Sequence, residues 1–329
     1  MDEVRWGFIG CGDVTEVKSG PAFRKIPDSG VVAVMRRDGE KARDYAQRHG
    51  VPKWYDDADD LIQDPDVNAV YVATPPGSHM EYTIQALKAG KPVYVEKPMA
   101  LNYGQCEQMI EASRHTGQPL FVAYYRRRLP AFLKVKEFID EGGIGEIRFV
   151  NLRLYWPPLK GDTDPAAQDW HVKPDISGGG YFFDLAPHQL DYLDYAFGPI
   201  TSASGHAANQ AGWYEPEDVV TASFQFENGV LGTGVWCFTI SGESNTDEIE
   251  IVGSEGHITL DCFGPQTVRL TTSGGEQVFE FENPQHVHQP LVQTVVNELL
   301  GRGTCPSTGE SGARTAWVMD EIVQEWRES

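Results

Sequence analysis

The chain has 329 residues, 40% of them hydrophobic, which is enough to bury a sizeable core and favours two domains over one. It carries 27 Lys and Arg against 48 Asp and Glu, and the resulting net charge of -21 disfavours nucleic acid and anionic membranes as partners. With no apolar run near the roughly 20 residues of a membrane span, no signal-peptide start and five scattered cysteines, the composition predicts a cytoplasmic protein without disulfides or structural zinc.

The first predicted strand, residues 5–9, feeds a glycine turn that precedes a helix. Gly10 and Gly12 allow a tight turn and let backbone N–H groups approach a pyrophosphate at the helix N-terminus, although many ordinary turns also contain two glycines. Thr15 replaces the third glycine of the pattern and is expected to change how the helix packs on the strand, or to cap it. The turn predicts dinucleotide binding by Gly10, Cys11, Gly12, Asp13 and Val14.

The second predicted strand, residues 31–35, ends in Arg36 and Arg37. At this spacing from the glycines, dinucleotide enzymes carry an acidic residue that binds the adenosine ribose. Two arginines suit a 2′-phosphate instead, because guanidinium groups bind phosphate oxygens. The alternative is a solvated basic strand end, but in a chain this acidic an adjacent arginine pair carries more weight. The pair predicts NADP(H) as the preferred cofactor, with NAD(H) still possible.

Two helices and another strand follow. Residues 40–49 form the first helix, with Asp38 as its cap and Gly50 as its stop. A short acidic helix over residues 57–62 leads into a buried strand over residues 69–73.

The loop at the end of that strand is a candidate wall of the cofactor site. Thr74, Pro75 and Pro76 end the strand and fix the loop. His79 lies near the start of the next helix and is expected to support the site rather than to catalyse.

The run of residues 93–98 is the most informative stretch of the first half. It begins as an apolar, β-branched strand and ends in Glu96, Lys97 and Pro98. Ligands of open α/β sheets sit just beyond the carboxyl ends of the strands, so this charged pair is placed where chemistry would happen. Pro98 restricts Lys97 to extended conformations and so directs its side chain. The alternative is a strand that ends in solvent with two surface charges.

Alternation of strands and helices continues to about residue 123. Asn102 and Gln105 predict a capping box for the next helix, and residues 119–123 predict another strand. The pattern is that of a doubly wound α/β domain over residues 1–123, built on a parallel sheet.

The second domain is predicted over residues 124–329, where strands and helices no longer alternate regularly. A helix over 130–141 and a strand over 147–155 precede a long loop over 156–180, and loops of this length are often functional. Residues 200–283 show short β segments with hairpin signals such as Asn228-Gly229, which predicts an α+β domain with a large open mixed or antiparallel sheet. One face of that sheet lacks helices to cover it, so we expect a homo-oligomer, a dimer or tetramer.

A glycine triplet over residues 178–180, which permits close approach of another group, precedes the second group of candidate catalytic residues. Asp184 and His188 are four residues apart and share one face of the helix that follows. A carboxylate beside an imidazole orients the ring, as a general acid/base pair requires. A metal cluster with Asp191 and a structural salt bridge are the alternatives, and the sequence offers no further ligand at metal spacing, so no metal is predicted.

These motifs together resemble the glucose–fructose oxidoreductase, inositol dehydrogenase and MocA (Gfo/Idh/MocA) family of nicotinamide-dependent oxidoreductases. The resemblance implies an N-terminal Rossmann domain, a C-terminal open sheet that often forms the oligomer interface, and a catalytic group of Lys97, Asp184 and His188. Thr15 and Arg36 depart from the family pattern. The matching stretches are Gly10–Gly12, residues 72–75, residues 96–98, residues 142–145, and residues 178–180 with Asp184 and His188.

The sequence therefore predicts an NADP(H)-dependent oxidoreductase that moves hydride to or from a carbinol or carbonyl carbon of a sugar, inositol or related polyol. The cofactor would also contact Arg36, Arg37, Thr74, Pro75, Pro76, His79, Glu96 and Lys97. The substrate would meet Tyr124, Arg126, Trp156 and Trp170, and the aromatic rings of Tyr124, Trp156 and Trp170 would suit the apolar faces of a sugar. The alternative is a catalytically silent protein of the same fold that senses NADP or a sugar.

Overall fold

The computed structural model describes residues 1–328 and shows two compact units, each built on one β-sheet. The first unit comprises residues 1–125 and 284–313, and the second comprises residues 126–283 and the segment that begins at Arg314. Residues 284–313, which the sequence assigns to the second domain, thus pack with the first unit. The predicted fold classes, a Rossmann unit and a unit with a large mixed sheet, are both confirmed.

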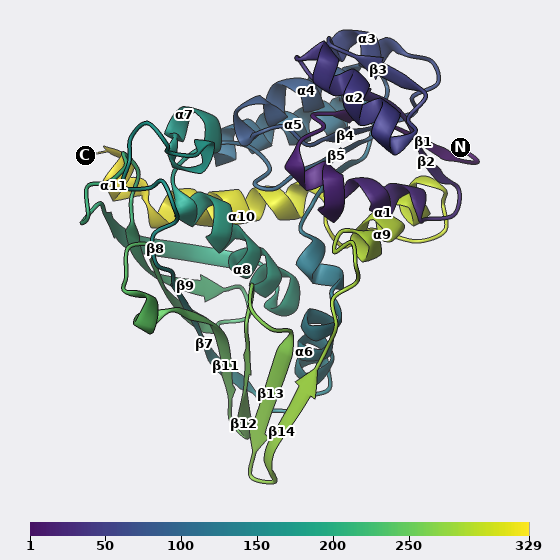
Figure 1. The fold of residues 1–329 in the computed structure, drawn as a ribbon. Helices are drawn as coiled ribbons and strands as arrows, with labels where there is room; N and C mark the ends of the chain where they lie inside the picture. The colour runs from purple at the N-terminus through teal and green to yellow at the C-terminus, as the bar shows by residue number, and fades with distance from the viewer. Residues whose placement is uncertain (329) are drawn as a thin grey trace. The chain divides into compact units, whose positions relative to one another are not determined.

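The sheet of the first unit has six parallel strands in the order β3-β2-β1-β4-β5-β6 (Figure 1). Each strand is short and largely apolar because both faces of the sheet are covered. The order of the strands reverses between β1 and β4, and ligands of such sheets bind at this reversal. The strands are β1 (Val4–Ile9), β2 (Ser29–Met35), β3 (Lys53–Tyr55), β4 (Ala69–Val72), β5 (Val93–Val95) and β6 (Leu120–Val122).

Helices cover the two faces of this sheet. The aromatic side chains of one face share a buried core with α1 (Gly20–Arg24), α2 (Gly39–His49) and α9 (Gln289–Leu299). On the other face, α3 (Ala58–Gln63) packs so closely that a side chain at Gly7 would meet Leu61. The remaining helices of this unit include α4 (His79–Lys88) and α5 (Tyr103–Thr116).

Local capping explains where the helices begin and end. The Asp38 side chain accepts a hydrogen bond from the Lys41 N–H, and Gly50 ends α2 in the left-handed conformation, as predicted. The capping box of α5 is only half formed. Asn102 accepts from the Gln105 N–H, but the Gln105 side chain accepts from Leu101 rather than from Asn102.

The segment after the glycine turn is not the single helix that the sequence predicts. A π-helical turn, Val14–Lys18, is followed by a break at Ser19 and then by α1. Thr15 is buried, and its hydroxyl donates to the carbonyl oxygen of Gly12 at 2.8 Å. A cap would accept from a backbone N–H instead, so Thr15 fixes the turn without capping a helix.

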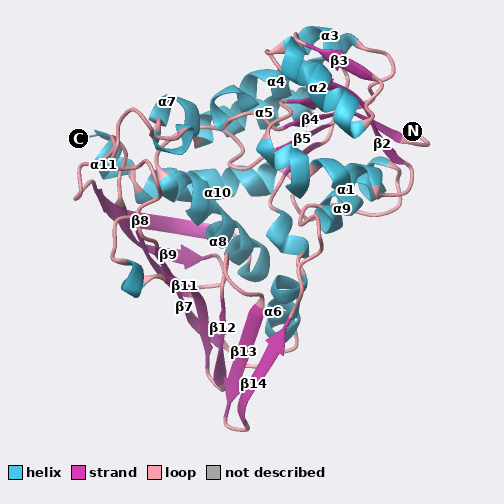
Figure 2. Ribbon diagram, viewed as in Figure 1, coloured by secondary structure: helices cyan, strands magenta, loops and turns pink. Residues whose placement is uncertain are grey.

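The sheet of the second unit has eight strands in the order β14-β13-β12-β11-β7-β10-β9-β8 (Figure 2). Neighbouring strands are antiparallel except for β7 and β10, which are parallel. The predicted hairpin turns at Asn228-Gly229 and at residues 273–275 are confirmed. The strands are β7 (Ile147–Tyr155), β8 (Ile200–Ala208), β9 (Val219–Phe226), β10 (Leu231–Cys237), β11 (Thr246–Gly253), β12 (Gly256–Leu260), β13 (Thr267–Thr272) and β14 (Gly275–Glu280).

Two helices pack against the second sheet, α6 (Pro130–Asp140) and α8 (Tyr181–Phe197). The Phe182 ring of α8 meets the buried Trp236 indole edge-on, and the Trp236 N–H donates to the Gln189 side chain at 2.7 Å. The side chains that alternate with the buried ones include Phe149, which is 40% exposed, and Leu231, which is 56% exposed. Because these two residues are paired across β7 and β10, they form one apolar patch.

Two short helical turns occupy the long loop that the sequence predicts over residues 156–180. They are η4 (Trp170–Val172) and α7 (Pro174–Ser177), which ends just before the glycine triplet. Across residues 1–328, none of the helices is both long and apolar enough to cross a membrane.

Candidate functional site

The glycine turn after β1 has the geometry of a phosphate cradle. Gly10 adopts a φ of +91°, and a Cβ there would lie 2.8 Å from the carbonyl of Ala73, so only glycine fits this close approach. A Cβ at Gly12 would meet nothing within 4 Å, so the tip of the turn is open to an approaching ligand. These residues fit a dinucleotide pyrophosphate held at a strand-to-helix turn.

Arg36 leaves the end of β2 and reaches back to this turn. Its Nη1 donates to the carbonyl oxygen of Cys11 at 3.1 Å, and the side chain is partly exposed. A guanidinium has five N–H donors, so this single bond leaves donors for a ligand phosphate. Arg37 is exposed. Burial raises the pKa of Cys11 to about 11, so its thiol stays neutral and contributes packing rather than charge.

His79 connects two loops at the carboxyl edge of the first sheet. Its Nε2 lies 2.6 Å from the Thr74 carbonyl oxygen, and its Nδ1 lies 3.0 Å from the Pro98 carbonyl oxygen. Burial lowers the pKa of His79 although these carbonyl groups favour the charged ring. The imidazole therefore ties the loop after β4 to the Glu96-Lys97-Pro98 segment after β5, which is a supporting position.

Glu96 points inward and fixes the backbone at Lys97. The Tyr71 hydroxyl donates to Glu96 Oε1 at 2.5 Å, and the Lys97 N–H donates to Oε2 at 3.2 Å. Burial raises the pKa of Glu96. His288, whose Nδ1 lies 3.6 Å from Glu96 Oε1, comes from the returning segment 284–313 and stacks on Tyr125. Lys97 itself is partly exposed.

In the second unit, the glycine triplet accommodates the protein's own side chains. Gly178 has a φ of +89° at the end of α7, and a Cβ at Gly179 would lie 2.2 Å from the Phe183 ring. A Cβ at Gly180 would lie 2.9 Å from Pro216. The close approach that the triplet predicts is therefore made by neighbouring protein segments, which set the start of α8 and hence the places of Asp184 and His188.

Three predicted site residues of the second unit gather around one ring, Phe263. His188 meets it edge-on at 5.6 Å between ring centroids, and the Arg126 guanidinium lies 4.4 Å over it. Trp156 packs against it at 5.3 Å. Sequence reasoning missed Phe263, because a single phenylalanine in a loop forms no motif and no periodic pattern.

A turn that is anchored by Asp247 holds Phe263 in place. The Asp247 carboxylate accepts hydrogen bonds from the N–H groups of Cys262, Phe263 and Gly264 at 3.0, 2.5 and 2.9 Å. The Arg126 side chain adds a bond to the Cys262 carbonyl oxygen at 3.0 Å. These bonds fix the backbone of residues 262–264 and hence the position of the Phe263 ring that contacts His188.

Asp184 lies beside a residue that the sequence does not single out, His171. The Nε2 of His171 is 3.8 Å from Asp184 Oδ2, and Trp170 stacks on the His171 ring at 3.8 Å between centroids. Asp191, the third member of the alternative metal cluster, is instead held by Arg127 through bonds of 2.8 and 2.6 Å. No group of three His, Cys, Asp or Glu side chains within residues 1–328 is arranged to hold a metal ion.

Tyr124, the remaining predicted substrate residue, belongs to the first unit and is only 2% exposed. Its ring therefore offers almost no surface to a substrate.

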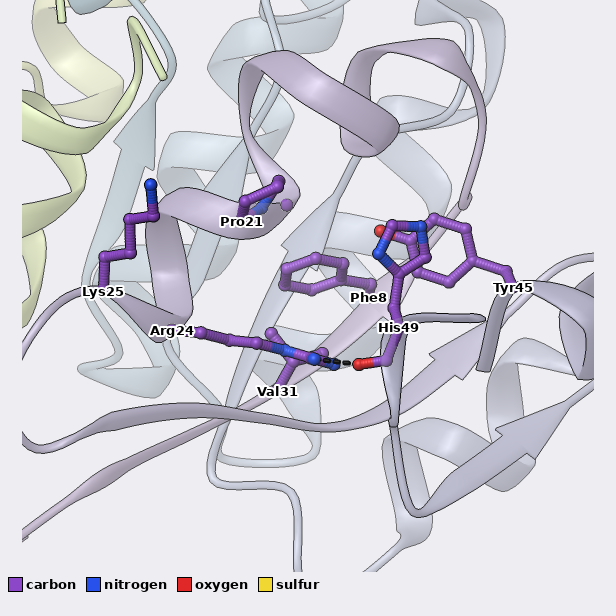
Figure 3. A pocket seen from close by; sticks show the side chains of 8 residues that line it. Phe8, Pro21, Arg24, Lys25, Val31, Tyr45 and His49 are labelled. Atoms are coloured by element: carbon purple, nitrogen blue, oxygen red, sulfur yellow. Dashed lines mark hydrogen bonds between the residues drawn. The ribbon is translucent and has the colours of Figure 1, made fainter. Parts of the chain in front are cut away.

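A cavity of about 240 Å³ in the first unit lies apart from these groups (Figure 3). The Arg24 guanidinium donates to the carbonyl oxygen of His49 beside it, and the Tyr45 hydroxyl donates to Thr15 at 2.9 Å. None of the predicted site residues lines the cavity, which sits where the helical segment after the glycine turn is broken. It is lined by Phe8, Gly20, Pro21, Arg24, Lys25, Val31, Tyr45 and His49.

Comparison with known proteins gives consistent matches over both units. Residues 4–124 match the oxidoreductase family with an NAD-binding Rossmann fold, and residues 132–259 match the Gfo/Idh/MocA C-terminal domain. The chain is 39% identical over 319 residues to oxidoreductase P35 of Formosa agariphila, which covers 96% of this chain and 97% of that protein.

Two further matches are more distant. The 1,5-anhydro-D-fructose reductase of Ensifer adhaerens is 28% identical, with 94% of this chain and 92% of that protein covered. The structure of a levoglucosan dehydrogenase in complex with NADH superposes with a TM-score of 0.90 at 22% identity, covering 99% of this chain and 97% of that one. The chain belongs to the Gfo/Idh/MocA family of oxidoreductases.

Proposed function

We propose that the protein is an NADP(H)-dependent dehydrogenase or reductase that acts on a CH–OH or carbonyl carbon of a sugar, inositol or related polyol. The observation that carries the proposal is α8, which bears Asp184 and His188 one turn apart. His188 contacts the Phe263 ring, against which Trp156 and Arg126 also pack. Asp184 lies 3.8 Å from His171, on which Trp170 stacks. Aromatic and charged groups in this combination suit a ring with several hydroxyls. The reductase and the dehydrogenase above are both named for sugar derivatives, which supports the same substrate class.

The proposal gives each polar residue a role. When bound, the nicotinamide cofactor supplies or takes up the hydride. Lys97 exchanges a proton with the reacting oxygen, His188 is the principal acid/base, and Asp184 orients the site and accepts a hydrogen bond from a substrate hydroxyl. The dinucleotide would be held by Gly10, Cys11, Gly12, Asp13, Val14, Arg36, Arg37, Thr74, Pro75 and Pro76. His79, predicted from the sequence as a cofactor contact, is buried with both ring nitrogens on backbone carbonyl oxygens and would support this site instead, as Glu96 would support Lys97.

The test of this function is a screen of purified protein against sugars, inositols and keto-sugars, with the absorbance of the reduced cofactor as the readout. Turnover of at least one polyhydroxy compound is expected. Tight cofactor binding without turnover of any compound would instead point to the silent sensor, a reading that the presence of Lys97 and His188 makes less favoured.

Cofactor choice is proposed to depend on Arg36. We expect the wild-type protein to bind NADP(H) more tightly than NAD(H) by roughly ten- to hundredfold. One charged hydrogen bond to the 2′-phosphate contributes about 1.5–3 kcal/mol to the binding free energy, which corresponds to that ratio of affinities. In Arg36→Asp the order should reverse, since a carboxylate accepts from the ribose hydroxyls and repels the phosphate. Fluorescence titration with both cofactors measures the two affinities.

Arg43→Asp is the matched control, because Arg43 lies exposed on α2 in the same unit and undergoes the same change of charge. It should leave the ratio of the two affinities unchanged. Equal affinity of the wild type for NAD and NADP, or an unaltered ratio in Arg36→Asp, would refute the assignment.

A homo-oligomer is proposed to form through the outer face of the second sheet. Phe149 and Leu231 form an exposed apolar patch there, and such patches mark interfaces. Light scattering at micromolar protein should show a multiple of the 36.5 kDa chain, at concentrations typical of interface affinities.

Leu231→Glu should reduce that mass toward the single chain, because it places a charge within the patch. Val17→Glu, at a residue of the first unit that is 62% exposed, should not change it. A wild-type mass of one chain would rule out the interface.

A further inference from the structure

The loop residue His171 is held in a defined orientation by its own neighbours. Asp169 begins the helical turn η4 by accepting the His171 backbone N–H at 3.2 Å, and the same carboxylate oxygen lies 2.5 Å from the ring Nδ1. A carboxylate only accepts, so Nδ1 carries the hydrogen in this contact. The other ring nitrogen, Nε2, faces Asp184.

The ring is also packed rather than loose. Trp170 stacks on it, and Tyr181, the first residue of α8, lies parallel to it at 6.4 Å. The Tyr181 hydroxyl donates to the buried Asp162 at 2.7 Å, which ties the loop to the start of α8. The separation of His171 from Asp184 is therefore set by an anchored loop, and a site built this way needs little reorganisation to bind.

The distance between the His171 and Asp184 side chains determines what the two groups could bind together. The distance from His171 Nε2 to Asp184 Oδ2 is 3.8 Å, which is too long for a direct hydrogen bond. An oxygen atom about 2.8 Å from each would lie beside this contact rather than in line between the two atoms, and from there one hydroxyl can bond to both groups. The side chains are 29% and 21% exposed, so a ligand oxygen can reach both. The simpler alternative is a weak ion pair within the loop.

We propose that His171 Nε2 and Asp184 Oδ2 together bind one hydroxyl of the substrate, next to the carbon that reacts. This rests on the proposed function, in which His188 lies one turn further along α8 and serves the reacting oxygen. The hydroxyl donates its hydrogen to Asp184 Oδ2, and the Nε2–H of His171 donates to the hydroxyl oxygen. The substrate class is thereby narrowed to compounds with oxygens on neighbouring carbons, and His171 sets that specificity.

The experiment measures binding as well as turnover. D-glucose, its monodeoxy derivatives and myo-inositol are titrated into cofactor-loaded wild-type protein and His171→Ala by calorimetry, and the same compounds are assayed for turnover. For one hydroxyl, the wild type should bind D-glucose about ten- to hundredfold more tightly than the derivative that lacks it. In His171→Ala that difference should vanish while the deoxy compound binds as before.

Two further variants distinguish a role of His171 in binding the substrate hydroxyl from a purely structural role. His171→Gln places an amide near the position of Nε2 and should recover part of the discrimination. His206→Gln is the control, because His206 is an exposed histidine of the same unit, 3.4 Å from a carboxylate of Glu325. It should behave as the wild type does.

The outcomes are distinguishable from those of the proposed function. The inference is wrong if His171→Ala keeps the discrimination, loses affinity for all probes equally, or if the wild type binds neither D-glucose nor myo-inositol. In each case turnover of some compound would leave the oxidoreductase assignment standing. Binding that depends on His171 without turnover of any compound would overturn the proposed function alone.

Discussion

Lys97→Met is expected to lower turnover by roughly 10²–10⁴-fold while the affinity for the cofactor stays within a few-fold of wild type. The substitution keeps most of the side-chain volume but removes the group that exchanges a proton with the reacting oxygen. His188→Ala should have an effect of the same order, since the imidazole is the principal acid/base of the proposal. Steady-state rates on the best compound of the screen, with cofactor affinity from fluorescence titration, measure both effects.

The matched control is Lys88→Met, at an exposed residue at the end of α4 in the same unit. Its turnover should equal that of the wild type. Rates at the wild-type level in Lys97→Met or in His188→Ala would exclude that residue from the chemistry, whatever the fate of the other.

The second large effect concerns stability. Asp191→Asn is expected to lower the free energy of unfolding by about 3–5 kcal/mol, because it leaves the Arg127 guanidinium buried without its carboxylate. The side chains of Arg127 and Asp191 are only 2% and 1% exposed. Burial raises the pKa of Asp191 to about 6 against the opposing effect of Arg127. Asp194 compensates only in part, since its carboxylate lies 3.8 Å from Arg127 and is held by Arg314 at 2.8 and 2.5 Å.

Denaturant unfolding of a small set of variants tests this account. The double variant Arg127→Met with Asp191→Leu should recover most of the loss, because two apolar residues of similar volume need no partner. Asp140→Asn, which removes an exposed partner of Lys136 on α6, should cost under about 1 kcal/mol. An Asp191→Asn protein as stable as the Asp140→Asn control would show that the buried pair is not essential.

The sequence predicts well those parts of the fold that depend on residues close together in the chain. Strands β4, β5 and β6 are fully buried and so appear as continuous apolar runs, and α2 is bounded by Asp38 and Gly50 next to it in the chain. The edge strand β3, with Trp54 exposed, has no such run, and the sequence does not predict it. Asp184 and His188 were placed on one helix by their spacing alone, and α8 contains both. Their chemical roles stay predictions.

The parts that sequence reasoning missed depend on contacts between distant residues. Phe263 contacts His188 from a loop held by Asp247, and Arg126 reaches the same loop across 136 residues of chain. His171 sits in a loop whose course depends on buried Asp162 and on Tyr181. No local period or motif encodes such pairings, so neither residue could be found without the fold. The break after the glycine turn was missed for the same reason, because the carbonyl oxygen of Thr15 accepts a hydrogen bond from the Tyr45 hydroxyl, 30 residues further along the chain.

The return of α9 to the first unit has a consequence for biosynthesis. Its side chains Leu291, Val292, Val295 and Val296 are fully buried in the core of a sheet whose last strand ends at Val122. Residues 1–125 leave the ribosome long before this helix has been made, so the part of the sheet face that α9 covers stays exposed while residues 126–283 are being translated, although α1 and α2 already cover the rest. The portion of the protein that is synthesised first can therefore complete its folding only after α9 has been made, and until then the apolar surface that α9 covers is exposed and prone to aggregation.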